Sequence, residues 1–395
     1  MHKKLLIFSW SVASLLLLVY SFTQIDLSLT FSRVSIWQYI QKIMQYIGYY
    51  MRPFSTYSVI AIILLMMGLY VWTLIKAAKG DLDNKTFWKI FIPVSIILFF
   101  SYNAFSYDFF NYIFDAKLVT YYHVDPHQFR ALDFYRDPML SFMHSTHRTY
   151  PYGPTWIWLT VPFSFLGANY FLGTFYLFKL LIVGSFVGSV YFLEKILILI
   201  KSKKVLFGTA LFALNPLVLV ESAVSAHNDI VMVFLGLGSL YFLLKKKWIL
   251  SIVFLILSMG IKYATILLVP FFLYVIFKNL KKSEVNLSVL FNLIFFVMLL
   301  AVAVVSLASG QNKNPEFQPW YLLIMLPFAS FLAPRTLVAF LVAFISLGAL
   351  ASYIPYLYNG EWPKNIVDLK LILLGISFVF GLVFYFTQKL IPSKS

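Results

Sequence analysis

The chain has 395 residues, of which 61% are hydrophobic and 12% are charged. A soluble domain has roughly 45–50% apolar and about 25% charged residues, so this composition excludes an ordinary soluble globule and the disordered and fibrous classes. The chain has no cysteine, which excludes a disulfide framework and thiolate metal sites, and its formal charge is +16.

Apolar segments long enough to cross about 30 Å of hydrocarbon recur from Leu5 to Phe386. They predict an all-α polytopic integral membrane protein with about 11–13 transmembrane helices, organised as one domain over residues 1–395. Two stretches, 154–168 and 248–277, are ambiguous, and the second is broken at Gly260 into pieces that are short for a full crossing. The clear spans are 5–23, 57–75, 90–106, 170–193, 205–222, 229–244, 286–308, 319–333, 336–356 and 367–388.

Lysine and arginine gather in seven short clusters between the spans, and these clusters contain 19 of the 31 basic residues. All seven fall on one side of the membrane if 154–168 adds no separate crossing and 248–277 crosses twice. The positive-inside rule then predicts a plasma-membrane protein with a cytoplasmic N-terminus, an uncleaved first helix and no nucleic-acid partner. The clusters lie at residues 3–4, 76–89, 195–204, 245–247, 278–282, 335 and 389–394.

The opposite, extracytoplasmic side receives two long segments and 11 of the 15 carboxylates. Residues 24–56 form the first outer loop, and residues 107–153 form a second loop that holds five aspartates and four of the six histidines. Basic residues therefore mark one face for insertion. We expect the chemistry on the other face, with 107–153 as an extracytoplasmic catalytic loop.

The first candidate residue, Asp108, follows the third predicted span in the sequence SYDFFNY. A carboxylate at the membrane interface among aromatic residues is costly unless it is hydrated or used, and it could serve there as a general base. An acidic side chain that reaches from a helix end into water is an equally good interpretation. Asp115, seven residues later, lies on the same helix face if the helix continues, where it could assist Asp108 or simply be solvated.

An aromatic turn follows at YPYGP, residues 150–154. Prolines bracket Gly153, and the rigid turn brings an aromatic-rich segment with Trp156 and Trp158 to the membrane interface. An aromatic belt at a helix start explains the tryptophans well, but it explains the tight Tyr-Pro-Tyr-Gly-Pro turn less well.

A polar turn lies between two apolar spans, where Glu221 precedes His227, Asn228 and Asp229. Ionisable groups in this position favour a functional site. A plain hairpin turn would need only the asparagine and the aspartate.

Lys262 lies between the two short apolar pieces of 248–277, at the outer surface, where membrane insertion does not explain a lysine. A cation at the turn of a broken helix suits an anion such as phosphate, with a snorkelling lysine as the equal alternative. Before a later span, Gln318 and Glu316 are more suggestive than Trp320, because tryptophan is a common belt residue.

The loop histidines include two pairs, His123 with His127 and His144 with His147, which could ligate a divalent metal if they lay on helices. Solvated loop histidines are the favoured interpretation, so no cofactor is predicted and a metal stays an open alternative. The chain has no P-loop, no GxGxxG motif after a strand and no nucleophile elbow.

The motifs SYDFFNY, YGP, LNPL, HND, IKYATILLVP and QPWYLL occur in this order over about residues 95–335. With them the chain resembles the polyprenol-phosphate-mannose-dependent mannosyltransferases of the GT-C superfamily, of the bacterial α-1,6-mannosyltransferase type. The resemblance implies a GT-C-like architecture with a long extracytoplasmic loop. It also implies a glycosyltransferase that moves a hexose such as mannose, with inversion, from a polyprenyl-phosphate donor in the lipid bilayer to an extracytoplasmic glycan or glycolipid acceptor.

The resemblance also implies roles for individual residues. Asp108 corresponds to the first-loop aspartate that acts as the base for the acceptor hydroxyl. Lys262 is the expected partner of the donor phosphate, with Arg148 or Arg130 as substitutes. The other expected substrate-binding residues are Asp115, Tyr152, His227, Asn228, Asp229, Gln318 and Trp320.

A transporter or flippase for a lipid-linked or polar substrate is the main alternative. Such a protein would carry ionisable residues at mid-membrane depth or broken helices in matched halves, whereas here only Lys179 lies deep within a span. A polysaccharide polymerase would carry a large outer loop late in the chain, which this sequence lacks. The transferase interpretation requires Asp108, His227 and Lys262 to share one outward-facing site.

Overall fold

The computed structural model describes residues 2–307, 317–332 and 336–390. Within these residues the regular structure is helical and there is no strand, which confirms an all-α, multi-pass membrane protein. Glu316 and the basic residues at positions 335 and 394 lie outside the described residues.

The first half of the chain consists of long helices, with shorter helices in and beside the two outer loops. Its helices are α1 (His2–Ser21), η1 (Phe22–Gln24), α2 (Ser35–Tyr49), α3 (Arg52–Lys79), α4 (Asn84–Phe99), α5 (Asp108–Thr120), η2 (Ala131–Phe134), η3 (Pro138–Ser141), α6 (Pro154–Leu166) and α7 (Phe171–Leu199).

The second half contains more breaks, including a π-helical turn, η4. Its helices are α8 (Val205–Ala213), α9 (Pro216–Leu219), η4 (Val220–Val224), α10 (Asp229–Leu244), α11 (Trp248–Met259), η5 (Tyr263–Leu268), α12 (Val269–Leu280), α13 (Leu287–Leu307), η7 (Pro319–Tyr321), α14 (Leu322–Ala329), η8 (Ser330–Leu332), α15 (Thr336–Ala351), α16 (Ile354–Asn359) and α17 (Ile366–Leu390).

Seven helices in the described part of the chain are long and apolar enough to cross a membrane, or eight if the pair Val205–Ala213 and Pro216–Val224, bent by 52°, is one span. The larger sequence-based count of about 11–13 includes segments that form shorter apolar helices, Asp229–Leu244, Trp248–Met259 and Pro319–Leu332. At 1.5 Å per residue, a helix of 12 residues such as α11 covers about 18 Å, which is less than the hydrocarbon thickness of about 30 Å.

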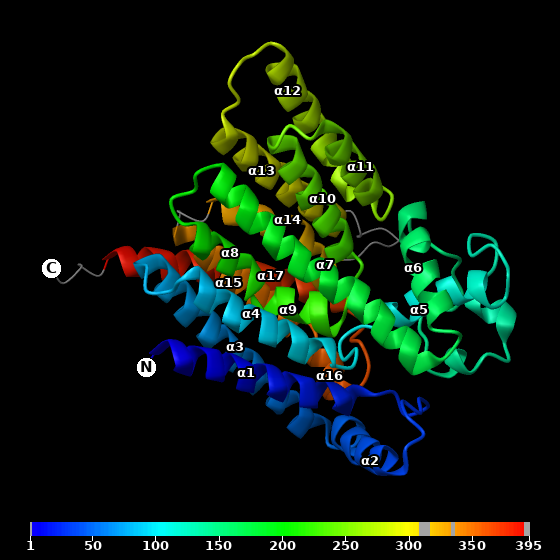
Figure 1. Ribbon diagram of the computed structural model, residues 1–395. Coiled ribbons are helices and arrows are strands. Elements are labelled where there is room, and N and C mark those ends of the chain that lie inside the picture. The colour runs from blue at the N-terminus through cyan, green and yellow to red at the C-terminus, as the bar shows by residue number, and fades with distance from the viewer. Residues whose placement is uncertain (1, 308–316, 333–335, 391–395) are drawn as a thin grey trace.

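The long helices bring basic loop residues to one end of the bundle. Lys3 at the start of α1 forms an ion pair with Asp83, which caps the start of α4. Near the same end, the Trp88 indole donates to Glu194 at 2.9 Å, which connects α4 to the end of α7. Figure 1 shows the start of α1 and the end of α17 on the left, whereas α5, α6 and the loop between them lie on the right.

The third span is shorter than the sequence predicts, because α4 ends at Phe99 and residues 101–107 are not helical. Polar side chains explain this end of the helix. The Ser101 hydroxyl donates to the Leu98 carbonyl at 2.6 Å, and the Asn103 amide donates to the Ser225 carbonyl at 2.6 Å. Asp108 is therefore the first residue of a separate helix, α5, and not the last turn of a span.

Helix α2, within the first outer loop, turns Gln41 and Gln45 inward, whereas Gln38 is exposed. Gln41 donates to the Leu29 carbonyl at 2.6 Å, and Gln45 donates to the Asp26 carbonyl at 2.8 Å. These bonds fasten residues 26–31 to the helix. The opposite side of α2 exposes apolar side chains such as Ile36 and Ile43, as expected of a helix that lies at the membrane surface.

Candidate active site

Asp108 starts α5 and faces two basic side chains. One carboxylate oxygen lies 3.8 Å from the Arg148 guanidinium, and the other lies 4.0 Å from Nδ1 of His227. The Asp108 side chain is 27% exposed, whereas His227 is completely buried. One side of the carboxylate therefore remains open to a ligand.

His227 is enclosed by the nearby Glu221 and by groups from two distant segments. Its Nε2 lies 3.3 Å from Glu221 Oε2, and the Tyr353 hydroxyl donates to the other Glu221 oxygen at 2.9 Å. The Trp320 ring stacks on the imidazole with a centroid distance of 4.0 Å and an interplanar angle of 19°. This packing fixes the plane of the imidazole next to Asp108.

The π-helical turn η4 explains how Glu221 and His227 come to face each other. Nζ of Lys179, on α7, donates to the Ala223 carbonyl, to the Val224 carbonyl at 3.0 Å and to the Ser101 hydroxyl at 3.2 Å. The lysine thus supplies donors to backbone oxygens of the turn. A π-turn is common at functional sites, because it displaces side chains from regular helical spacing.

Lys262 is paired with a carboxylate in the same network. Its Nζ lies 2.6 Å from Asp229 Oδ2 and 5.6 Å from the centre of the Tyr152 ring. The neighbouring Asn228 accepts a hydrogen bond from the Tyr112 hydroxyl at 3.3 Å, and the Tyr112 ring packs edge-on against Tyr152 at 5.4 Å. Tyr112 on α5 therefore connects the Asp108 and Lys262 halves of the site.

Two glycine-containing turns bring these halves together. The Gly153 amide donates to the Ile261 carbonyl at 3.1 Å, and the Thr155 amide donates to the Gly260 carbonyl at 2.9 Å. A Cβ on Gly153 would lie 2.3 Å from the Gly260 oxygen, so only glycine allows this approach. The YPYGP turn and the Lys262 turn are therefore positioned against each other by direct backbone contact.

Asp115 lies on the same face of α5 as Asp108, as the sequence predicts for a helix that continues. Its partial burial raises the pKa of its carboxyl to about 7. Arg148 opposes this rise and the nearby Asp108 charge adds to it. Asp115 therefore changes charge in the physiological pH range.

Buried polar atoms without a hydrogen-bond partner in the protein are concentrated here. Of 14 such side-chain atoms among the described residues, seven belong to residues 221–229. They include Oδ1 of Asp229, Nδ2 of Asn228 and both ring nitrogens of His227, whose approaches to Glu221 and Asp108 are ion-pair contacts without hydrogen-bond geometry. Such groups are rare in folded proteins, and where they cluster they mark a place at which a ligand supplies the missing partners.

The structure thus brings Asp108, Asp115, Tyr152, His227, Asn228, Asp229, Lys262 and Trp320 into one network. Gln318 is at its edge, two residues before Trp320, where its oxygen accepts from Lys370 at 3.1 Å.

Arg130 is absent from the network, because it pairs with Asp133 in the exposed part of the loop at 3.0 Å.

The histidine pairs do not form the spacing that a metal site on a helix needs. His123, His127, His144 and His147 lie in non-helical segments, and His144 stacks on Tyr107 with a centroid distance of 3.8 Å. In the described ranges, no three His, Cys, Asp or Glu side chains are grouped so as to hold a metal ion.

Sequence reasoning did not assign Tyr353 or Lys179 to the site. Lys179 left a signal, as a single cation deep within an apolar span. Tyr353 left none, because it lies 132 residues after its partner Glu221 within another apolar segment.

Comparison with known protein families gives a match over much of the chain. The family model described as the N-terminal domain of alpha-(1->6)-mannopyranosyltransferases matches residues 11–278, which is more than half of the chain. This range contains Asp108, the 221–229 turn and Lys262, but not Trp320 or Tyr353. No curated protein and no solved structure matches the chain.

Proposed function

The chain belongs to the alpha-(1->6)-mannopyranosyltransferase family, and from this premise we propose that it transfers mannose from a polyprenyl-phosphate donor to a glycan or glycolipid acceptor. Family membership makes the protein a membrane mannosyltransferase. The donor, the acceptor, inversion at the anomeric carbon and the roles of individual residues are the content of the proposal.

One observation carries the assignment of the site. The buried polar atoms that have no partner in the protein cluster at residues 221–229, directly beside the partly exposed carboxylate of Asp108. Each such group costs about 1–3 kcal/mol when it is left without a hydrogen bond. Sugar hydroxyls and a phosphate can satisfy these atoms, whereas an apolar ligand cannot.

Asp108 is the proposed base. It takes the proton from the acceptor hydroxyl while that oxygen forms a bond to C1 of the mannosyl group. The bond between C1 and the phosphate oxygen breaks, and its electron pair leaves with the polyprenyl phosphate. His227, 4.0 Å from Asp108 and stacked on Trp320, positions the carboxylate and contacts the substrate.

Arg148 and Lys262 are the proposed partners of the donor phosphate. Arg148 lies 3.8 Å from Asp108, so it can contact the leaving group near the reacting carbon. An ammonium group has three N–H donors, so Lys262 can keep its contact with Asp229 while it donates to phosphate. The leaving group is an anion that is stable without a proton, so cations serve better here than a general acid.

The proposed site faces the extracytoplasmic side of the plasma membrane. The ion pair between Lys3 and Asp83 connects basic loops at the opposite end of the bundle, which the positive-inside rule makes cytoplasmic. Nucleotide sugars are made in the cytoplasm, so a site on the outer side requires a lipid-linked donor that enters from the bilayer.

The test is transfer by the purified protein in proteoliposomes. Polyprenyl phosphate carrying radiolabelled mannose and GDP-mannose are each supplied with α-1,6-mannobiose as acceptor. We expect a mannosylated product only from the lipid-linked donor, with a new α-1,6 linkage by NMR. The proposal would be overturned if GDP-mannose gave a product and the lipid-linked donor did not. It would also be overturned if well-folded protein gave no product with either donor.

A further inference from the structure

A second site lies on the opposite face of α5 from Asp108. Residues 108, 112 and 115 lie on one face of this helix, and residues 113, 117 and 121 lie on the other. Ile113, Lys117 and Tyr121 line a cavity of about 1250 Å³, which is larger than the roughly 300–1,000 Å³ of ordinary ligand pockets. None of the candidate active-site residues lines this cavity.

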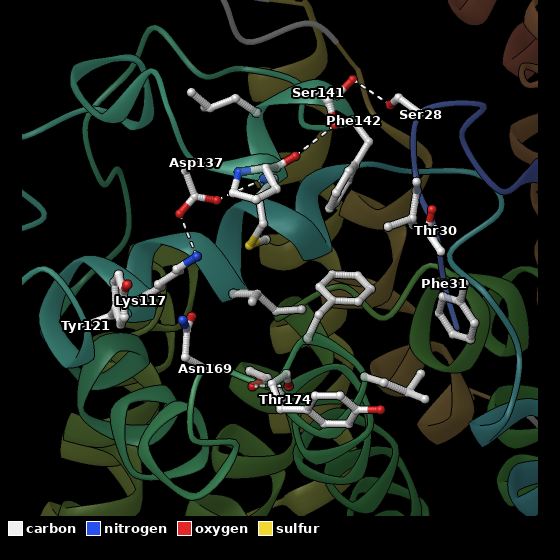
Figure 2. A pocket seen from close by; sticks show the side chains of 18 of the residues that line it. Ser28, Thr30, Phe31, Lys117, Tyr121, Asp137, Ser141, Phe142, Asn169 and Thr174 are labelled. Atoms are coloured by element: carbon white, nitrogen blue, oxygen red, sulfur yellow. Dashed lines mark hydrogen bonds and ion pairs between the residues drawn. The ribbon is translucent and has the colours of Figure 1, made fainter. Parts of the chain in front are cut away.

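Four segments enclose the cavity: residues 28–33 of the first outer loop, α5, residues 135–142 and residues 164–174. In Figure 2, Ser28, Thr30 and Phe31 lie on one side of the space, and Lys117, Tyr121 and Asn169 lie on the other. The lining contains hydroxyl groups, the Asn169 amide and aromatic rings, together with aliphatic and charged side chains.

The walls of the cavity are connected by specific bonds. Asp137, whose side chain is 1% exposed, forms an ion pair with Lys117 and accepts from the Tyr122 hydroxyl at 2.7 Å. The Ser28 hydroxyl donates to the Ser141 carbonyl at 2.8 Å, which connects the first outer loop to the second. These bonds between the two outer loops therefore hold the walls of the cavity in place.

The charges of the lining favour an uncharged ligand inside the cavity. Lys117 is neutralised by Asp137, and the other two cations of the lining, Arg33 and Arg136, are exposed. Sugar rings carry hydroxyls around their edges and C–H groups on their faces. Hydroxyl and amide side chains can form hydrogen bonds to the sugar hydroxyls, and aromatic rings can pack on the C–H faces.

We infer that this cavity, here named the α5 pocket, binds the non-reacting sugars of an oligosaccharide acceptor. The inference rests on the proposed function, because it takes the acceptor to be a glycan that ends at Asp108. Residues 141–148 support this connection: Ser141 and Phe142 line the pocket, His144 stacks on Tyr107 just before the start of α5, and Arg148 lies beside Asp108. An acceptor of several sugars would thus gain contacts that a disaccharide cannot reach.

The test compares α-1,6-linked mannotetraose with α-1,6-mannobiose, by calorimetric binding and by acceptor KM. The variant combines Tyr121→Ala with Tyr135→Ala, because these pocket side chains are 52% and 74% exposed and their loss should not affect folding. The control combines Tyr39→Ala with Tyr46→Ala, which are 69% and 58% exposed on α2 and outside the pocket.

We expect the unmodified protein and the control to bind mannotetraose about tenfold more tightly than mannobiose. The pocket variant should lose this preference while its kcat with mannobiose stays unchanged. Equal binding of the two sugars by the unmodified protein, or an unchanged preference in the pocket variant, would overturn the inference. Binding of dodecyl phosphate that the two pocket substitutions weaken would also overturn it, since the pocket would then be a lipid headgroup site.

The binding measurement separates this inference from the proposed function. Length-dependent binding that depends on Tyr121 and Tyr135, without any transfer of mannose, would count against the reaction and leave the pocket assignment standing. Transfer to mannobiose without length-dependent binding would do the reverse.

Discussion

The two faces of α5 use polar side chains in opposite ways. On the face of Asp108 and Tyr112, the adjoining turn at 221–229 carries seven buried polar atoms without a hydrogen-bond partner in the protein. On the face of Lys117, no side chain that lines the α5 pocket contributes to the unpartnered atoms found in the described residues. There the Asp137 carboxylate forms an ion pair with Lys117 and accepts hydrogen bonds from the Tyr122 hydroxyl and the Met139 amide.

This difference is the one expected between the proposed reaction site and the proposed recognition site. Unpaired buried groups lower stability, and they persist where a substrate supplies their partners in the bound state. A pocket wall without unpartnered buried polar atoms avoids this loss of stability and can bind neutral sugars through many weak contacts. The helix α5 thus lies between the proposed reaction site on its Asp108 face and the proposed recognition site on its Lys117 face.

The largest expected effect is on the reactive face. Asp108→Asn keeps the shape of the side chain but removes the base, so we expect the single-turnover rate to fall by about 10²–10⁴-fold. The melting temperature should not fall, because the carboxylate is partly exposed and its basic neighbours lie at 3.8 and 4.0 Å. A rate within threefold of the unmodified protein, in a folded sample, would remove Asp108 from the role of base.

The matched change on the other face should have the opposite result. Asp137→Asn leaves the Lys117 charge without its partner, and we expect about 3 kcal/mol less stability and a normal kcat per folded molecule. Thermal unfolding in detergent measures the loss. The double variant Lys117→Met/Asp137→Asn removes both charges, so it should recover part of the stability; no recovery would argue against the ion pair as the cause.

A smaller effect on activity is expected at Lys262, in the proposed phosphate site. Lys262→Gln removes a cation from the proposed phosphate site, so we expect the donor KM to rise by about tenfold. It also leaves the buried Asp229 carboxylate without its partner, so stability should fall and rates are compared per folded molecule. The acceptor KM should stay unchanged in the same assay. The matched control is Lys278→Gln, on α12 and outside the site. A donor KM unchanged by Lys262→Gln would leave Arg148 as the phosphate partner.

The smallest effect concerns Asp115. Its pKa is about 7 in the folded protein and near 3.8 in an unfolded chain, so the folded state binds an extra proton between these values. Folded-state stability therefore declines as pH rises from about 4 to about 7. Asp115→Asn cannot ionise, so we expect it to be more stable than the unmodified protein at pH 8 and about equally stable at pH 4.

Melting temperatures at the two pH values measure this difference. Asp133→Asn is the control, because Arg130 and its backbone amide lower the pKa of the Asp133 carboxyl. Its loss should therefore decrease stability at high pH. An Asp115 variant with the same pH dependence as the unmodified protein would contradict the partial burial of this carboxyl.

The sequence predicts the membrane class and most of the reactive face, because hydropathy and charge sorting are local signals. Asp108, His227 and Lys262 stand out as ionisable groups at span ends that insertion does not explain. Their meeting depends on contacts between distant turns, such as Gly153 against Gly260, that no local pattern encodes.

Other features could not be predicted for a related reason. The α5 pocket depends on where α5 begins, and the sequence pattern places the end of the preceding span at residue 106 instead of Phe99. The pairing of His123 with His127 and of His144 with His147 assumes helices, whereas the chain is irregular at these residues. Tyr353 reaches Glu221 across 132 residues, beyond any periodicity.

The central claim is that Asp108 and His227 act as one unit in mannosyl transfer, and a double-mutant cycle tests it most directly. Single-turnover rates are measured for Asp108→Asn, His227→Gln and the double variant with polyprenyl-phosphate mannose. The account predicts that the double variant is about as slow as Asp108→Asn alone, because residues of one unit lose their effect together. Losses that multiply in the double variant would contradict it.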